Sequence, residues 1–288
     1  MDYKSYHIPV LLNQLIENFK LTDEATIIDG TMGFAGHATA ILEKFPKVEY
    51  IGFDKDTAAI EIAKKRCDKF KNVSIINQPF SEILSYCLKK HIKPTHILLD
   101  LGVSSFQIDQ SYRGFTFQKD EPLDMRMDLE SSLTAYTVVN TYSKEVLVNL
   151  LKIEADIKSP DKFVDQLILK RTTQPIETTF DLVECIKFGF FVRSRAQFIA
   201  MCTKVFQAIR IEVNSEMNEL NTALHHMLSL PNTTIAIITF QPNEDRLVKQ
   251  FVKANNLERI TKKPIQASYH EAKKNPREKS AKLRIFKI

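Results

Sequence analysis

The chain has 288 residues, of which 44% are hydrophobic and 26% charged, so a wholly disordered chain is excluded and one large domain or two ordinary ones are expected. No apolar run approaches the roughly 20 residues of a membrane-spanning helix. The net charge is +5, but from Arg246 to Ile288 there are 13 Lys or Arg and only three acidic residues, so the rest of the chain is mildly acidic.

The cysteine usage favours a reducing compartment. Cys67, Cys87, Cys185 and Cys202 form no C-x-x-C pair and lie near no histidine cluster with zinc spacing, so neither a disulfide framework nor a metal site is expected. Residues 1–7 lack the basic-then-apolar pattern of a secretory signal. We therefore expect a cytoplasmic protein without a membrane anchor.

Short apolar segments alternate with helical patterns over the first hundred residues. The expected strands end near Asp29, Asp54, Ile76 and Asp100, and they span residues 25–29, 50–54, 73–76 and 96–100. The expected helices between them span residues 36–45, 56–70 and 81–90. This order predicts a parallel sheet with right-handed crossovers, in which ligands bind at the carboxyl ends of the strands.

The pattern changes after Asp100. Residues 106–128 are loop-like, and residues 131–206 show only helical periodicity. A long helix (208–227), a strand (234–240), a helix (243–254) and a strand (281–287) follow. The sequence thus predicts an α/β domain, residues 1–108 and 206–288, interrupted by an all-helical insert, residues 109–205.

The turn after the first strand indicates a nucleoside-binding site. The spacing of Gly30, Gly33 and Gly36 is not the G-x-G-x-x-G of dinucleotide-binding folds. Asp54 ends the second strand, where an acid can accept hydrogen bonds from both ribose hydroxyls. Phe80 could lie against a purine, and Asp100 ends the fourth strand, at the centre of the expected cleft. Each residue alone could be a helix cap or core residue, but their order along one β-α-β array predicts an S-adenosylmethionine site.

Longer motifs make the assignment specific. Residues 98–109 read Leu-Leu-Asp-Leu-Gly-Val-Ser-Ser-Phe-Gln-Ile-Asp, and residues 112–117 read Tyr-Arg-Gly-Phe-Thr-Phe. Both closely resemble the ribosomal RNA small-subunit methyltransferase H family (RsmH, also called MraW). Further matching blocks cover nearly the whole chain: residues 7–12, 29–37, 122–128, 206–214, 261–265, 275–277 and 280–284.

The resemblance implies a class I S-adenosylmethionine-dependent methyltransferase fold, with a Rossmann-like sheet and a helical insert that recognises RNA. The implied reaction is methylation of the exocyclic N4 amine of a cytidine in the decoding region of 16S rRNA, so the implied partner is that RNA or the small ribosomal subunit. The family's cofactor contacts fall on Ala35, Gly36, His37, Asp54, Phe80, Asp100 and Gln107. Of these, His37 and Gln107 come from the resemblance alone.

Three departures from the family pattern bear on function. Ala35 stands where the family usually has Gly, and its methyl group could crowd the methionine part of the cofactor. Gln241 and Pro242 replace a His and a Ser beside the expected site, and residues 154–171 match poorly. Two alternatives therefore stay open: a related methyltransferase that acts on another RNA or on DNA cytosine amines, and an RNA-binding assembly factor without catalysis.

The chemistry needs a group that orients a weakly nucleophilic amine. Asp100 is the candidate catalytic residue, assisted by the carbonyls of Leu101 and Gly102. Asp124 and Asp128 are weaker candidates, since they could instead pair with Arg126 or Arg113. No cysteine is placed for covalent attack, which favours a nitrogen target.

Aromatic and basic side chains are candidates for RNA contacts. Phe106, Tyr112, Phe115 and Phe117 could stack on a flipped base, or could instead fix their loop to the insert. The candidate phosphate contacts are Arg193, Arg195, Arg210, Arg246 and the cations of the basic tail, with plain surface charge as the alternative for each. The tail itself indicates a polyanionic partner, RNA or DNA first, or a solvated Lys-rich segment.

Overall fold

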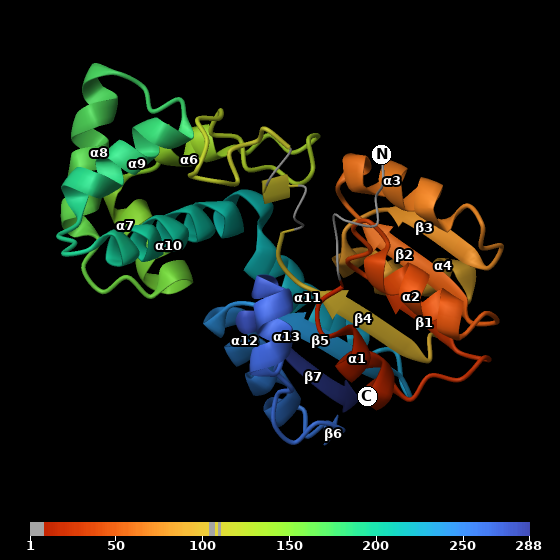
Figure 1. Ribbon diagram of the computed structural model, residues 1–288. Coiled ribbons are helices and arrows are strands. Elements are labelled where there is room, and N and C mark those ends of the chain that lie inside the picture. Colours follow the sequence, from red (N-terminus) through yellow and green to blue (C-terminus); the bar gives the residue numbers. More distant parts are fainter. Residues whose placement is uncertain (1–8, 104–106, 109–110) are drawn as a thin grey trace. The chain divides into compact units, whose positions relative to one another are not determined.

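The computed structural model describes residues 9–103, 107–108 and 111–288. The chain forms two compact units, one made of Met1–Gly102 with Met217–Ile288 and the other of Val103–Glu216 (Figure 1). Phe106, one of the expected stacking residues, lies outside the described residues, as does His7 in the first matching block.

The first unit contains a seven-stranded sheet of order β3-β2-β1-β4-β5-β7-β6. Its first five strands are parallel, and β7 pairs antiparallel with both β5 and β6. The strands are β1 (Thr26–Asp29), β2 (Glu49–Asp54), β3 (Val73–Asn77), β4 (His96–Asp100), β5 (Thr234–Thr239), β6 (Glu258–Arg259) and β7 (Lys282–Lys287). The expected α/β fold is therefore confirmed, with the short edge strand β6 as an element that was not predicted.

Apolar clusters cover both faces of the sheet, and successive side chains of a strand join opposite clusters because they alternate between the two faces. In β4, Leu98 belongs to one apolar cluster, and Ile97 and Leu99 belong to the other. The first cluster includes residues of α1 (Leu12–Phe19), α2 (Gly36–Lys44) and α3 (Thr57–Cys67). The second includes residues of α4 (Ile83–Lys90), α11 (Glu216–Met227) and α12 (Pro242–Ala254). Two further helical elements follow α12, namely α13 (Tyr269–Lys274) and a 3-10 turn, η3 (Pro276–Lys279).

The second unit is helical where its secondary structure is regular. Its longer helices are α6 (Ala135–Thr141), α7 (Lys144–Ala155), α8 (Asp161–Thr173), α9 (Thr179–Gly189) and α10 (Arg195–Asn214). Thr134, Ser143, Thr178 and Ser194 cap four of these helices through their side-chain oxygens. The helices enclose their own apolar core, which includes Phe163, Leu182 and Val205. None of the described helices is both long and apolar enough to cross a membrane.

The prediction of one helix over residues 208–227 is wrong. The helix α10 starts earlier and ends at Asn214, and Ser215 adopts a left-handed conformation (φ 51°) before α11 begins. Asn214 holds this break, because its side chain donates to the carbonyl of Met125 and accepts from the N–H of Met127. Hydrophobic periodicity continues across the break, so the sequence pattern alone does not reveal it.

The unit boundaries differ from the expected domain limits. The sequence pattern places them after residues 108 and 205, whereas the compact units divide at Gly102–Val103 and Glu216–Met217. The second boundary falls later because α10 is a continuous helix whose residues Val205, Phe206 and Ala208 lie in the core of the second unit.

Candidate active site

Asp29 anchors the turn after β1 through two hydrogen bonds within the fold. Its side chain is buried, and it accepts hydrogen bonds from the Tyr50 hydroxyl (2.7 Å) and the Thr31 N–H (3.1 Å). Burial raises the pKa of Asp29, and the hydrogen bond from Tyr50 opposes that rise. Both oxygens are thus used to fix the start of the turn.

Gly30 lets the turn pass close to the neighbouring strands. A Cβ at this position would overlap the side chain of Leu99 and come within 2.7 Å of the Cβ of Phe80. The turn therefore lies against the carboxyl end of β4 and the residue that follows β3. Three of the predicted site segments, from β1, β3 and β4, are brought together by this contact.

Ala35 caps α2 in a left-handed conformation (φ 58°, ψ 34°) and is fully buried. Such a conformation costs a non-glycine residue about 1–2 kcal/mol, which explains why Gly suits this position. The residue packs with the apolar cluster that contains Met32 and Ala38. The Ala35 methyl group is thus part of the core packing of the turn.

A larger side chain at Ala35 is expected to be poorly tolerated. Valine is β-branched and would be both strained in this conformation and overpacked, so Ala35→Val should lower the free energy of unfolding by about 3 kcal/mol. Ala35→Gly should change it by less than about 1 kcal/mol, because relief of backbone strain offsets the lost methyl contacts. Chemical denaturation of the two variants tests this, and equal losses for both would contradict the strained turn.

Asp54 links the end of β2 to the same turn. One of its oxygens accepts the Gly33 N–H (2.8 Å), and the other accepts the Asp56 N–H (2.8 Å). Burial raises the pKa of Asp54 to about 6, although the two backbone hydrogen bonds oppose this. The carboxylate is thus fixed beside the glycine turn, and a carboxylate oxygen retains capacity for further hydrogen bonds.

His37 and Asp100 face each other across the turn. His37 is buried and donates from Nε2 to the carbonyl of Val10 (3.0 Å), which leaves the Nδ1 lone pair 3.6 Å from Oδ2 of Asp100. Burial lowers the pKa of His37 and raises that of Asp100 to about 7. Near neutral pH the carboxyl group of Asp100 is therefore close to a change of protonation state, whereas burial favours the neutral form of His37.

Asp100 also carries an unpartnered buried oxygen. Among the described residues no group hydrogen-bonds its Oδ1, although the backbone N–H of Asp100 donates to the Thr31 hydroxyl (2.6 Å). A buried acceptor without a partner costs free energy, so such an atom at a strand end marks a place for a ligand donor.

Two residues that were not predicted to belong to this site support it. Glu219, on α11, accepts the Phe80 N–H (3.1 Å) and pairs with Lys55 (2.8 Å), so it fixes the residues that follow β2 and β3. Arg277, on η3, lies close enough to lower the pKa of Asp100 against the effect of burial. Both lie far along the chain from their partners, so no local spacing could have indicated them.

We define the strand-end site as the 29–37 turn together with Asp54, Phe80 and Asp100. The structure brings Ala35, Gly36, His37 and these three residues together in the first unit. Gln107 lies in the second unit, where it is buried and its carbonyl accepts the Ser111 hydroxyl (2.6 Å). Its role as a cofactor contact therefore stays a prediction.

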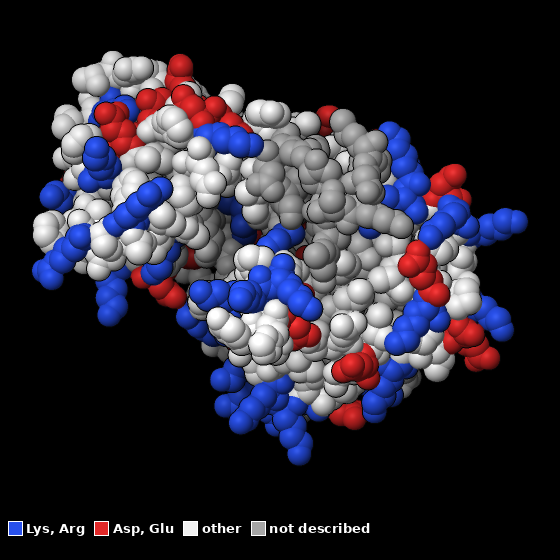
Figure 2. Space-filling view, in the orientation of Figure 1, with Lys and Arg blue, Asp and Glu red and all other residues white. Residues whose placement is uncertain are grey.

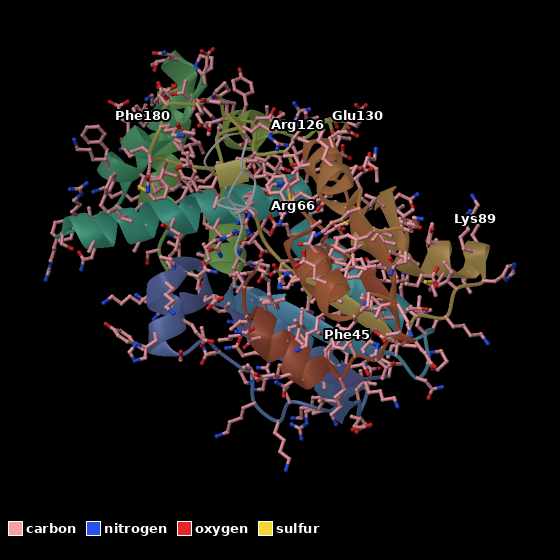
Figure 3. All side chains as sticks on the ribbon, turned by 45° about the vertical axis from the view of Figure 1, so that its right-hand side comes forward. Phe45, Arg66, Lys89, Arg126, Glu130 and Phe180 are labelled. Carbon is pink, nitrogen blue, oxygen red and sulfur yellow. The ribbon has the colours of Figure 1, made fainter. Side chains whose placement is uncertain are left out.

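Asp124 is a structural residue of its loop. Arg126, labelled in Figure 3, donates to both of its carboxylate oxygens (2.9 and 2.7 Å), which lowers the pKa of Asp124 despite partial burial. Asp128 accepts the Glu130 N–H, and Arg113 donates to the carbonyls of Arg126 and Met127. The structural alternative weighed for Asp124, pairing with Arg126, is thus the one observed.

The aromatic residues of the same loop divide into two kinds. Phe115 and Phe117 pack against the core of the second unit, and Phe117 meets Phe206 edge to face at 5.5 Å. Tyr112 is 70% exposed. Only Tyr112 of these three therefore keeps an exposed ring for stacking on a base.

The arginines predicted to contact phosphate also divide. Arg210 forms a bidentate pair with Glu216 (2.8 and 2.9 Å), so it acts within the fold. Arg193 is exposed and lies over the ring of Phe191, while Arg195 and Arg246 are exposed.

Gln241 and Pro242, which differ from the family pattern, form the start of α12. Gln241 is the buried cap residue, Pro242 takes the first helical position, and Glu244 accepts the N–H groups of Phe240 and Gln241. This departure therefore has a local structural role.

The strand-end site fits a cationic nucleoside. Asp54 can accept hydrogen bonds from ribose hydroxyls, and Asp100 presents an oxygen that no group in the described part of the chain hydrogen-bonds. A positive charge nearby would favour the ionised forms that burial disfavours in both carboxyl groups. With the sheet order, these features define a class I methyltransferase, which uses S-adenosylmethionine as methyl donor.

Comparison with known proteins agrees with this class. The chain matches the family model described as the MraW methylase family over residues 4–288 and belongs to that family. It is 39% identical to "Ribosomal RNA small subunit methyltransferase H" of Clostridium botulinum (strain Kyoto / Type A2), with 99% of each chain covered. It is 40% identical to the protein of the same name from Mycoplasma mobile, with 98% of this chain and 97% of the relative covered. The family resemblance, the enzyme class and the cofactor expected from the sequence are thereby confirmed.

Proposed function

We propose that this protein methylates the exocyclic N4 amine of a cytidine in the decoding region of small-subunit (16S) ribosomal RNA, in the cytoplasm. The observation that carries the proposal is Oδ1 of Asp100 at the carboxyl end of β4, which has no hydrogen-bond partner among the residues that the structure describes. The relatives named as small-subunit rRNA methyltransferases support the choice of RNA.

The target amine needs orientation more than activation by a strong base. Its lone pair is conjugated with the pyrimidine ring, and S-adenosylmethionine, when bound, supplies an electrophilic methyl group on a sulfonium. Asp100 Oδ1 accepts a hydrogen bond from the amine and fixes its direction, assisted by the carbonyls of Leu101 and Gly102. Once the nitrogen carries the methyl group it becomes acidic, and Asp100, with a pKa raised to about 7, can take the proton and pass it to solvent.

Asp54, Phe80 and the turn hold the methyl donor in this proposal. Asp54 accepts the ribose hydroxyls, and Phe80 lies against the purine. Ala35, Gly36, His37 and Gln107 complete the proposed cofactor contacts. The four cysteines do not offer a covalent route, because they are buried and burial raises the pKa of each thiol to about 11.

The second unit is the proposed RNA-recognition domain. Phe188 and Phe191 are 59% and 84% exposed, and each has a cation over its ring, Lys187 and Arg193 respectively. Phe180, labelled in Figure 3, is 48% exposed. Exposed aromatic rings beside cations suit unpaired bases and phosphates of RNA.

Cofactor affinity should depend on pH. Asp54 must be ionised to accept from both ribose hydroxyls, and its pKa is raised to about 6, so affinity for S-adenosylmethionine should fall as the pH drops through 6. Titration calorimetry between pH 5 and pH 8 measures this. In an Asp54→Asn variant the decrease should be smaller, and an unchanged profile in that variant would assign the dependence to another group.

The function is tested by mapping the modification. Small subunits from a strain that lacks this protein should have no base methyl group on the decoding-region cytidine, and purified protein with S-adenosylmethionine should restore it. Mass spectrometry of nuclease fragments locates the methyl group. Retention of the base methylation in the deletion strain would refute the proposed substrate, and cofactor binding without any RNA product would favour the non-catalytic assembly factor.

A further inference from the structure

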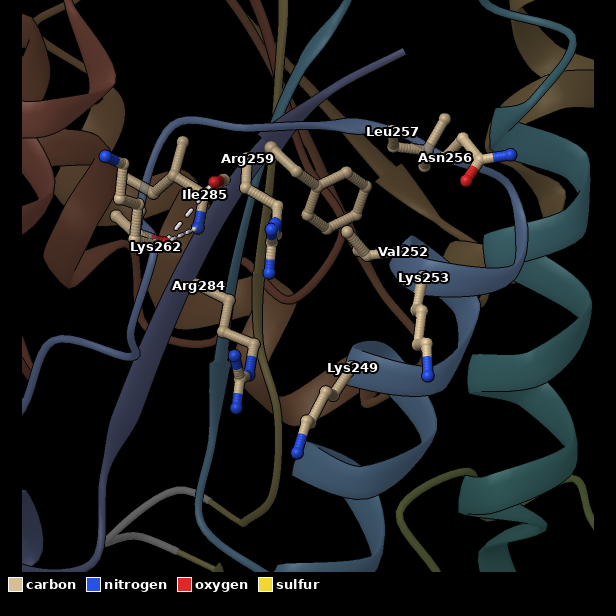
Figure 4. Close-up of a pocket in the computed structure, with 11 residues that line it drawn as sticks. Lys249, Val252, Lys253, Asn256, Leu257, Arg259, Lys262, Arg284 and Ile285 are labelled. Atoms are coloured by element: carbon tan, nitrogen blue, oxygen red, sulfur yellow. Dashed lines mark hydrogen bonds between the residues drawn. The ribbon is translucent and has the colours of Figure 1, made fainter.

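A second basic site lies away from the strand-end site. A pocket of about 410 Å³ opens between α12, the segment around β6 and the strand β7 (Figure 4). Ile285 and Phe286 of its lining pair with Ala236 and Ile235, in the amino-terminal half of β5. The strand-end site lies at the carboxyl ends of the parallel strands, so the two sites are separate features of the first unit.

The described residues that line the pocket include five cations and no acid. They come from three segments, with two on α12, two around β6 and one on β7: Lys249, Lys253, Arg259, Lys262 and Arg284. Figure 2 shows Lys and Arg side chains gathered over the part of the first unit that carries β6. Like charges that converge in this way repel one another, so a binding partner that carries negative charge would relieve the repulsion.

One of the five lining cations is held by an ion pair, and the other four are exposed and can contact a ligand. Arg284 donates to both oxygens of Asp245 (2.7 and 3.2 Å), which holds its guanidinium group at the side of the pocket. Among the residues that the structure describes, the other four lining cations form no ion pair, and their side chains are exposed. The pocket therefore combines one positioned guanidinium group with three exposed ammonium groups and a second, exposed guanidinium group, which suits phosphate groups.

The base of the pocket is partly apolar and is held together by backbone and side-chain hydrogen bonds. Val252 and Phe286 are nearly fully buried, and Leu257 is half-buried. Thr261 and Ile285 exchange hydrogen bonds that tie the β6 segment to β7 (dashed in Figure 4). This lining fits a sugar or base beside the phosphate, and the volume lies within the usual range of ligand sites.

We propose that this pocket binds a phosphodiester segment of the RNA substrate, at a distance from the methylated base. The inference rests on the RNA substrate proposed above and adds a second contact that anchors the same RNA. Free nucleotides share the phosphate chemistry. RNA is the source we favour, because the cations extend beyond the pocket along the basic tail from Arg246 to Lys287.

The test removes three of the exposed charges together. Lys249, Lys253 and Lys262 are replaced by Gln, and the matched control replaces the exposed residues Lys89, Lys90 and Lys93 (Figure 3 labels Lys89 on α4). Exposed substitutions of this kind rarely unfold a domain, and thermal unfolding checks each variant. Affinity for a small-subunit rRNA transcript is then measured against salt concentration, with AMP as the free-nucleotide probe.

The pocket variant should show a slope of log affinity against log salt that is shallower by about 2, because each phosphate contact to a single strand contributes about 0.7. Between 50 and 200 mM salt the wild type should thus lose about 20-fold more affinity than the pocket variant. Cofactor affinity should not change. An unaltered salt slope in the pocket variant, or the same change of slope in the control variant, would overturn the proposal. So would tight AMP binding that only the pocket variant loses, if the slope for RNA stays unaltered in that variant.

If the proposed substrate were wrong, the result would differ from the one that rejects the pocket. In that case the wild-type protein would leave the decoding-region cytidine unmethylated, whatever the salt dependence of RNA binding. A wild type that methylates normally and binds RNA with the same slope as the pocket variant would reject the pocket alone.

Discussion

Replacement of Asp100 by Asn is expected to lower kcat by a factor of about 10²–10⁴, the usual contribution of a positioned proton-transfer group. The amide still fills the position at the end of β4, but its oxygen does not take the proton from the methylated amine. Steady-state methylation of small subunits with saturating cofactor measures the loss. Wild-type turnover in this variant would remove Asp100 from the reaction.

Stability distinguishes a catalytic role of Asp100 from a structural one. Its pKa is about 7 in the folded protein against an ordinary value of 3.8, so the folded state favours the protonated form. The stabilisation from that protonated form is complete below about pH 4 and is lost as the pH rises through about 7. The Asp100→Asn variant should therefore be more stable than the wild type at pH 8, and this difference in stability should be smaller at pH 4. A variant that loses both activity and stability at pH 8 would indicate a structural role.

Replacement of Asp54 by Ala is expected to weaken binding of S-adenosylmethionine by about 1–3 kcal/mol, the cost of losing hydrogen bonds at a buried polar site. This corresponds to a roughly 5- to 150-fold higher Kd. Isothermal titration measures the change directly. The Gly33 N–H also loses its acceptor, so some of the effect acts through the turn.

Asp56 provides a matched control two residues away. It caps α3 by accepting the Ala58 N–H (3.0 Å), and its loss should lower the free energy of unfolding by about 1 kcal/mol. Cofactor affinity of Asp56→Ala should stay within about twofold of the wild type, because the cap energy acts on the helix. Equal losses of affinity in both variants would show that Asp54 acts only through the fold of this segment.

The strands of the first unit could be predicted because the sequence pattern of each strand is contained within a few consecutive residues. Segments such as His96–Asp100 combine a continuous apolar run with a terminal acid, and their alternation with helices fixes a parallel sheet. The placement of Asp54 and Asp100 at strand ends follows from the same pattern. The contact between His37 and Asp100 could not be predicted from this pattern, because it depends on the direction in which α2 leaves the turn.

Other features depend on contacts between distant segments. The pairing of Glu219 with Lys55, and the proximity of Arg277 to Asp100, join residues from opposite parts of the chain. The break at Ser215 is set by Asn214 and its bonds to the loop around Met125. The basic pocket is also a product of the fold, since its cations are separated in sequence and converge only when β7 lies beside the β6 segment.

The position of β7 affects the order in which the chain can fold during synthesis. This strand lies between β5 and β6, and the N–H of Ile288 donates to the carbonyl of Thr233. The sheet therefore stays incomplete, with an open edge at β5, until the ribosome has released residues 282–288. The helical unit is continuous in sequence from Val103 to Glu216, and it can form its core while the sheet of the first unit still lacks β7.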